Sequence, residues 1–167
     1  GMRQRAIIAM ALACNPRILI ADEPTTALDV MIQAQIIELL EKLQRELDLS
    51  LVVVTHDLGV VAEMCDDVLV MYGGVVAEHA DSDTIFNNPR HPYTQRLLKA
   101  FPDIAEPGSD LASIPGNPPR LDNLPPGCRF EPRCHLSNGE SCLREKPPLI
   151  EIEAGHFVAC HRVNEDL

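Results

Sequence analysis

The sequence has no tryptophan, and aromatic residues make up only 4% of its 167 residues. Apolar residues still account for 46%, a proportion typical of a folded globular protein that excludes a disordered chain. The length is sufficient for one compact domain with an appendage. Because rings are so scarce, we expect the core to be built from aliphatic side chains.

Positive charge is also scarce, since 14 Lys and Arg stand against 25 Asp and Glu, a net charge of -11. This balance argues against nucleic acid as a partner and against a polybasic membrane-surface role. No apolar run reaches the 18 or more residues of a transmembrane helix, and residues 1–20 do not resemble a signal peptide. We therefore expect a cytoplasmic protein whose association with any membrane depends on a partner.

Proline is distributed unevenly along the chain. Residues 1–100 contain four prolines and residues 101–167 contain ten. Proline fixes φ and lacks a backbone donor, so the second region should consist largely of loops and turns. This predicts two parts, an ordered domain over residues 1–100 and a Pro-rich extension over residues 101–167.

The pattern of the first part is α/β. Residues 3–13 predict a buried helix, residues 30–47 an amphipathic helix, and residues 17–21 and 51–55 two strands buried on both faces. Asp57 could cap a helix over residues 58–64, and Gly73-Gly74 suggests a hairpin turn between strands 68–72 and 75–78. Shorter helices are expected over 81–86 and 93–100. Strands that alternate with helices imply a mainly parallel sheet covered on both sides.

Two of the predicted strands end in polar residues of chemical interest. Asp22 and Glu23 follow the first strand, at the edge where open α/β sheets bind ligands. An Asp there can hold Mg²⁺ and the neighbouring Glu can polarise a water, although two solvated acids would look the same. His56 ends the second strand, where it could contact a phosphate or simply cap a loop.

In combination these features resemble the ABC ATPase family. The order is Gly-Met-Arg-Gln-Arg, Ile-Leu-Ile-Ala-Asp-Glu-Pro, Thr-Ala-Leu-Asp and Val-Val-Val-Thr-His-Asp, all within residues 1–57. The resemblance implies a partial P-loop NTPase fold, with Gly1 and Gln4 in the tail of the signature motif. It further implies that Asp22 binds Mg²⁺, that Glu23 is the catalytic glutamate, that Asp29 belongs to the D-loop and that His56 is the switch histidine.

The family resemblance also implies partners and cofactors. Its members bind ATP and Mg²⁺ between two ATPase subunits, identical or different, and drive transmembrane permease subunits. The phosphate-cradling motif Gly-x-x-x-x-Gly-Lys-Ser/Thr does not occur in these 167 residues. We therefore expect ATPase activity in a full-length parent, no activity in this polypeptide alone, and self-association through its uncovered sheet edge.

Four of the six cysteines lie in the Pro-rich extension, namely Cys128, Cys134, Cys142 and Cys160, with the spacing C-x5-C-x7-C-x17-C. A loop-rich segment gains stability from a metal anchor. Four thiolates suit an iron–sulfur cluster, zinc with help from His135, His156 or His161 is possible, and free thiols remain the simplest alternative. Cys14 and Cys65 are expected to be small buried apolar residues.

The extension itself resembles that of oligopeptide/dipeptide permease ATPases, on His-Pro-Tyr-Thr at residues 91–94 and Cys-Arg-Phe-Glu-Pro-Arg-Cys at residues 128–134. This resemblance implies a [4Fe–4S] cluster on the four cysteines and a role in peptide import, with a peptide-binding protein as an indirect partner. The location would be the inner face of the cell membrane, through the permease subunits. The alternative is a non-catalytic fragment or cluster-carrying interaction module.

Overall fold

A computed structural model describes residues 1–100 and 113–163, which form two compact units: residues 1–65, and the described residues from 66 onward. The composition boundary near residue 100 adjoins residues outside the described part, so the division into residues 1–100 and 101–167 stays a prediction.

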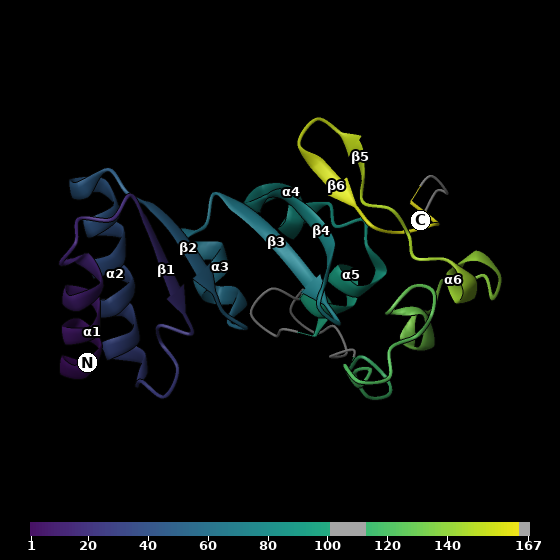
Figure 1. The fold of residues 1–167 in the computed structure, drawn as a ribbon, viewed down its shortest axis with the longest axis horizontal. Helices are drawn as coiled ribbons and strands as arrows, with labels where there is room; N and C mark the ends of the chain where they lie inside the picture. The colour runs from purple at the N-terminus through teal and green to yellow at the C-terminus, as the bar shows by residue number, and fades with distance from the viewer. Residues whose placement is uncertain (101–112, 164–167) are drawn as a thin grey trace. The chain divides into compact units, whose positions relative to one another are not determined.

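The first unit contains three helices and a two-stranded parallel sheet (Figure 1). Its elements are α1 (Met2–Leu12), β1 (Ile18–Asp22), α2 (Val30–Leu47), β2 (Ser50–Val54) and α3 (Leu58–Met64). The β1 and β2 strands run in register from the pair Ile18 and Ser50 to the pair Asp22 and Val54. All five predicted elements of this region are present, and the α/β class is confirmed.

The core of the first unit is aliphatic, as expected. It consists of one buried cluster to which α1, β1, α2 and the residue just before β2 contribute: Ile8, Leu19, Ile36, Leu40 and Leu49. Only one face of each element is buried, however. Ile8 is the one buried residue of α1, so the prediction of a buried helix is wrong. Ile20 and Val52 are 68% and 47% exposed, which also contradicts strands buried on both faces.

The second unit contains an antiparallel sheet with the strand order β3-β4-β6-β5. Its elements are β3 (Asp67–Tyr72), β4 (Val75–Asp81), α4 (Ser82–Asn87), α5 (Pro92–Lys99), the 3-10 turn η1 (Glu131–Arg133), α6 (Ser141–Arg144), β5 (Ile150–Glu153) and β6 (His156–Val158). The predicted hairpin at Gly73-Gly74 is confirmed. Among the described residues only β1 and β2 pair in parallel, so the sheets are mixed and not mainly parallel as expected; β3 and β4 are antiparallel because a two-residue turn joins them.

The Pro-rich extension is mostly irregular, as predicted, but it also supplies β5 and β6. The β6 strand pairs with β4, and Ala159 donates a backbone hydrogen bond to Ala77 at 2.8 Å. The last part of the chain therefore completes a sheet that begins before residue 70. Ile150-Glu151-Ile152-Glu153 alternates with period two ahead of Gly155, a strand and turn signal that was available in the sequence.

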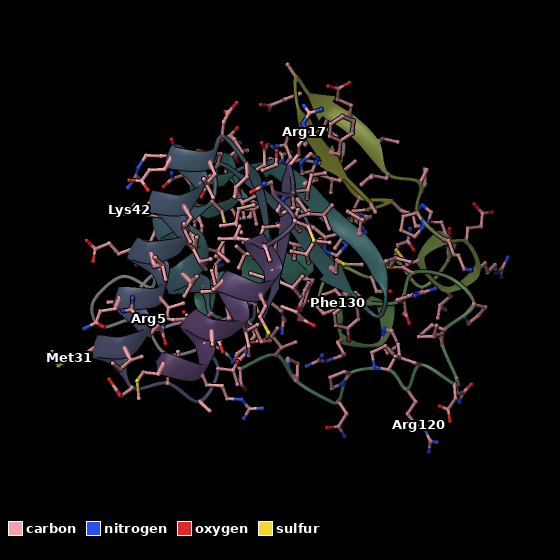
Figure 2. All side chains as sticks on the ribbon, turned by 60° about the vertical axis from the view of Figure 1, so that its left-hand side comes forward. Arg5, Arg17, Met31, Lys42, Arg120 and Phe130 are labelled. Carbon is pink, nitrogen blue, oxygen red and sulfur yellow. The ribbon has the colours of Figure 1, made fainter. Side chains whose placement is uncertain are left out.

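The core of the second unit contains an aromatic cluster beside buried aliphatic residues such as Ile85, Leu98 and Val158, so the expectation of an aliphatic core is only partly met. Tyr72 lies 4.6 Å from Tyr93 and 5.1 Å from Phe130 between ring centroids, and Tyr93 lies 5.4 Å from Phe130. Phe130 is 1% exposed, whereas Arg120, also from the extension, points away from the ribbon (Figure 2). Three of the six aromatic residues thus gather in one cluster, so low aromatic content did not predict their placement.

Candidate functional site

The carboxyl ends of β1 and β2 bring the predicted chemical residues to one edge of the parallel sheet. Asp22 is the last residue of β1 and pairs with Val54, the last residue of β2. The next residue, Glu23, donates its backbone N–H to the carbonyl oxygen of Val54 at 2.8 Å. Glu23 has a φ of +48°, so the chain turns sharply as it leaves the strand.

Glu23 and His56 form a hydrogen-bonded pair at this edge. His56 Nδ1 lies 2.8 Å from Glu23 Oε1, and the Thr26 hydroxyl donates to Glu23 Oε2 at 2.6 Å. The bonds from His56 and Thr26 lower the pKa of the Glu23 carboxyl, and the same carboxylate raises the pKa of His56. The hydrogen bond therefore favours a proton on His56 Nδ1 and an ionised Glu23 carboxylate.

The segment between Glu23 and α2 is a hydrogen-bonded loop. Thr26 N donates to Glu23 O at 3.2 Å, and the side chain of Asp29 caps α2 by accepting from Ile32 N at 3.0 Å. Gln4 on α1 donates from Nε2 to the carbonyl oxygen of Pro24 at 2.7 Å. Thr26 and Asp29 thus stabilise a tight loop and begin the next helix.

The start of α1 packs closely on the first turn of α2. A Cβ at Gly1 would approach Ile32 to 2.9 Å, so this position has no room for a rigid larger side chain. Gln4 reaches the loop that follows Glu23, whereas Gly1 contacts the turn that follows Asp29. The site residues predicted from the N-terminal motifs are therefore contiguous in this unit, although their catalytic roles stay predictions.

The donor chemistry at this edge is compatible with Mg²⁺ held together with a phosphate ligand. No group of three or more His, Cys, Asp or Glu side chains with metal-binding geometry occurs among the described residues. Mg²⁺ does not require one, because it is commonly held by one or two carboxylates together with water and substrate phosphates. Asp22 is an exposed carboxylate at the strand end and meets that requirement.

The thiols of Cys128, Cys134 and Cys142 lie near enough to Cys160 to contribute to its raised pKa, and none of the four is in a disulfide. Cys128 donates its backbone N–H to the carbonyl oxygen of Cys142 at 2.8 Å. Burial raises the pKa of the Cys128 and Cys134 thiols and raises that of Cys160 to about 11, with the other three thiols adding to the effect on Cys160. The thiols of Cys128, Cys134 and Cys160 are therefore half-buried groups that give up their protons less readily than an exposed cysteine.

A metal centre at these cysteines is not supported by the described geometry, in which they form no metal-binding group. The three histidines that could serve as zinc ligands have other hydrogen-bond partners. His135 accepts from Arg96, His156 is hydrogen-bonded to the Glu78 carboxylate, and His161 is hydrogen-bonded to the carbonyl oxygen of Glu145. Cys14 is exposed, so its prediction as a buried residue is wrong, and Cys65 is half-buried. Cys14 lies just after α1, which ends at Leu12.

A buried carboxylate at Glu78 was not predicted from the sequence. Its side chain is fully buried on β4, and Oε1 lies 2.8 Å from Nε2 of His156 on β6. The same carboxylate accepts the backbone N–H groups of Arg90 at 2.6 Å and His91 at 3.1 Å. One side chain thus joins the sheet, the start of the His-Pro-Tyr-Thr segment and the extension.

This chain is similar to peptide-transport ATP-binding proteins over its whole length. The profile described as the oligopeptide/dipeptide transporter C-terminal region matches residues 77–142. The oligopeptide transport ATP-binding protein OppD of Salmonella typhimurium is 50% identical over 167 residues, which is 100% of this chain and 49% of that protein. AppD of Bacillus subtilis is 50% identical, and the dipeptide transport protein DppD of Escherichia coli is 51% identical, each over 99% of this chain and 50% of its own length.

The chain therefore spans about half the length of the curated relatives it matches. Among solved structures, a dimeric ATP-binding cassette in a post-hydrolysis state with ADP and phosphate is 40% identical over 49% of this chain and 35% of that one, with a TM-score of 0.45. Over the described residues, no helix is both long and apolar enough to cross a membrane. The sequence of this chain is that of the C-terminal part of an oligopeptide-type ABC transporter ATP-binding protein.

Proposed function

We propose that this chain is part of an ATPase subunit that powers peptide import and that it contributes Glu23 and His56 to the ATPase site. The observation that carries the proposal is the Glu23–His56 pair, 2.8 Å apart where two parallel strands end. The relatives described as oligopeptide and dipeptide transport ATP-binding proteins support the substrate class.

In this proposal Glu23 orients and polarises the attacking water. An ionised carboxylate accepts a hydrogen bond from water, and the lowered pKa keeps Glu23 in that form. Mg²⁺ bound at Asp22 would supply the positive charge that offsets the phosphate oxygens. His56, which shares its proton with Glu23, fixes the direction of the carboxylate and offers its second ring nitrogen to the surroundings.

The nucleotide site would be completed by parts that these 167 residues do not contain, including the phosphate-cradling loop. Backbone N–H groups and the Lys of such a loop make most contacts to the phosphates. The polypeptide of residues 1–167 should therefore bind ATP weakly and hydrolyse none. A second ATPase subunit and permease subunits at the inner membrane face are the proposed partners.

Substitution of Glu23 by Gln tests the catalytic role. In the protein that carries the complete ATP-binding domain, Glu23→Gln should lower kcat by at least about a hundredfold while ATP still binds, because the amide cannot polarise water. Glu38→Gln, an exposed change on α2, is the matched control and should retain full turnover. Undiminished turnover of Glu23→Gln would refute the assignment.

For the extension, the [4Fe–4S] assignment from the family stands as a proposal supported by four thiols that influence one another. The opposing observation is that they form no ligand group in the described structure. Metal and sulfide analysis of anaerobically purified protein decides between the cluster, zinc and free thiols. Stoichiometric zinc in a colourless sample would exclude the cluster.

A further inference from the structure

Gln33 and Asp57 connect α2 to the loop that carries His56. Gln33 Nε2 donates a hydrogen bond to Asp57 Oδ2 at 2.9 Å, across 24 residues of sequence. Both side chains are half-buried, so water competes for this bond less than at an open surface. Hydrogen bonds to a charged acceptor are also the stronger kind.

The hydrogen bond from Gln33 to Asp57 is not part of the N-cap of α3. The cap of α3 uses only Oδ1, which accepts from Gly59 N at 2.9 Å and Val60 N at 3.4 Å. The backbone N–H of Asp57 donates to Thr55 Oγ1 at 3.1 Å. Both sequence neighbours of His56 are therefore held, and the second carboxylate oxygen is left for Gln33.

The backbone of Gln33 is hydrogen-bonded to Asp29, at the end of the loop that follows Glu23. Its backbone N–H donates to the carbonyl oxygen of Asp29 at 2.9 Å, in the first turn of α2. The Glu23–His56 bond then closes a ring that runs from Glu23 through the loop to Asp29, Gln33, Asp57 and back to His56. Because these contacts form a closed ring, a displacement of one residue in it changes the hydrogen-bond geometry at the other residues.

We propose that Gln33 and Asp57 are positioning residues that hold His56 against Glu23 and transmit movements of the loop at residues 24–29 to this pair. The consequence for turnover rests on the proposed ATPase function, whereas the effect on His56 does not. Neither residue contacts the pair's reacting atoms, and the role of Gln33 depends on its amide donor.

The test reads the His56 ring directly in the ¹⁵N-labelled 167-residue chain. Long-range ¹H–¹⁵N spectra, recorded at a pH above the raised pKa of His56 so that the ring is neutral, distinguish the Nδ1–H from the Nε2–H tautomer. A carboxylate 2.8 Å from Nδ1 favours the Nδ1–H form. Gln33→Met keeps the length but removes the donor, and should lower the ratio of Nδ1–H to Nε2–H up to about tenfold.

Two further variants separate positioning from general destabilisation. Gln35→Met changes the same residue type on the same helix, where the amide oxygen accepts a hydrogen bond from Arg5, and should leave the His56 spectrum unchanged. Gln33→Lys restores a donor to Asp57 and should restore the Nδ1–H form. A wild-type His56 spectrum in Gln33→Met, or loss of the Nδ1–H form in a natively folded Gln33→Lys, would overturn the proposal.

The same variants in the protein with the complete ATP-binding domain extend the test to turnover. Gln33→Met should lower kcat about three- to tenfold and leave KM for ATP nearly unchanged, because positioning is lost and nucleotide contacts are not. Equal kcat for Gln33→Met and Gln35→Met in an enzyme that Glu23→Gln inactivates would overturn the positioning role alone. If no variant and no wild-type protein hydrolyses ATP, the proposed function fails while the tautomer ratio still decides this inference.

Discussion

Removal of the Glu78 carboxylate should destabilise the second unit more than any surface change. Glu78 is 0% exposed, and its partner His156 has a side chain that is 3% exposed. Glu78→Ala leaves the His156 Nε2 and the two N–H groups of Arg90 and His91 without their acceptor. Loss of one partner from a buried pair costs about 3–5 kcal/mol, and each orphaned buried donor about 1–3 kcal/mol.

These costs overlap, since water that enters the space left by the carboxylate can satisfy part of the set. We therefore expect Glu78→Ala to lower the free energy of unfolding by about 3–5 kcal/mol. Glu78→Gln keeps one acceptor oxygen but turns an N–H₂ group toward a donor, and should cost about 1–3 kcal/mol. The free energy of unfolding should increase in the order Glu78→Ala, Glu78→Gln, wild type, because these retain none, one and two side-chain acceptor oxygens.

Urea unfolding followed by far-UV circular dichroism measures the total effect, and hydrogen exchange with mass spectrometry localises it. Exchange should accelerate in β6 and in residues 89–92, which the carboxylate joins, and much less in α2 of the other unit. Glu153→Ala is the matched control, because Glu153 is an exposed glutamate on the neighbouring strand β5. Equal stability of Glu78→Ala and Glu153→Ala would refute the reasoning.

Three more predictions follow from burial. Burial lowers the pKa of His91 to about 4, so protons bind the unfolded state first as the pH falls, and the second unit should lose up to about 3 kcal/mol between pH 6.5 and 4; His91→Gln should flatten this slope in pH-dependent urea titrations. Exposed Cys14 should react with iodoacetamide well before Cys160, whose thiol pKa of about 11 leaves little thiolate, and equal rates by mass spectrometry would contradict the described burial. The exposed face that contains Ile20 and Val52 should promote self-association, and sedimentation velocity should show a shift toward monomer in Ile20→Lys, with Lys42→Glu on α2 as the control that leaves association unchanged.

The elements of the first unit were predictable because their signals are local. The spacing of Ile36, Ile37 and Leu40 describes one face of α2, and all three are buried there. Asp29 and Asp57 act as caps because an Asp at such a position bonds to backbone N–H groups within three residues. The order of motifs also identified the family, which the comparisons bear out.

Burial was predicted less well, since it depends on what packs against each face. The apolar residues of α1 and β1 predicted elements buried all round, yet Met10 is 69% exposed and Ile18 60% exposed. The sequence shows that these side chains are apolar, but neither their neighbours nor the edges of a sheet can be read from one segment.

The sequence by itself determined approximately where the helices and strands of the first unit begin, which residues end the parallel strands and which family these residues resemble. Only the tertiary structure decided that His56 reaches Glu23, that Gln33 reaches Asp57 and that Glu78 meets His156 from 78 residues away. The reason is physical: secondary structure and caps follow from contacts within a few residues, whereas these pairs exist only after β1 has paired with β2 and β4 with β6.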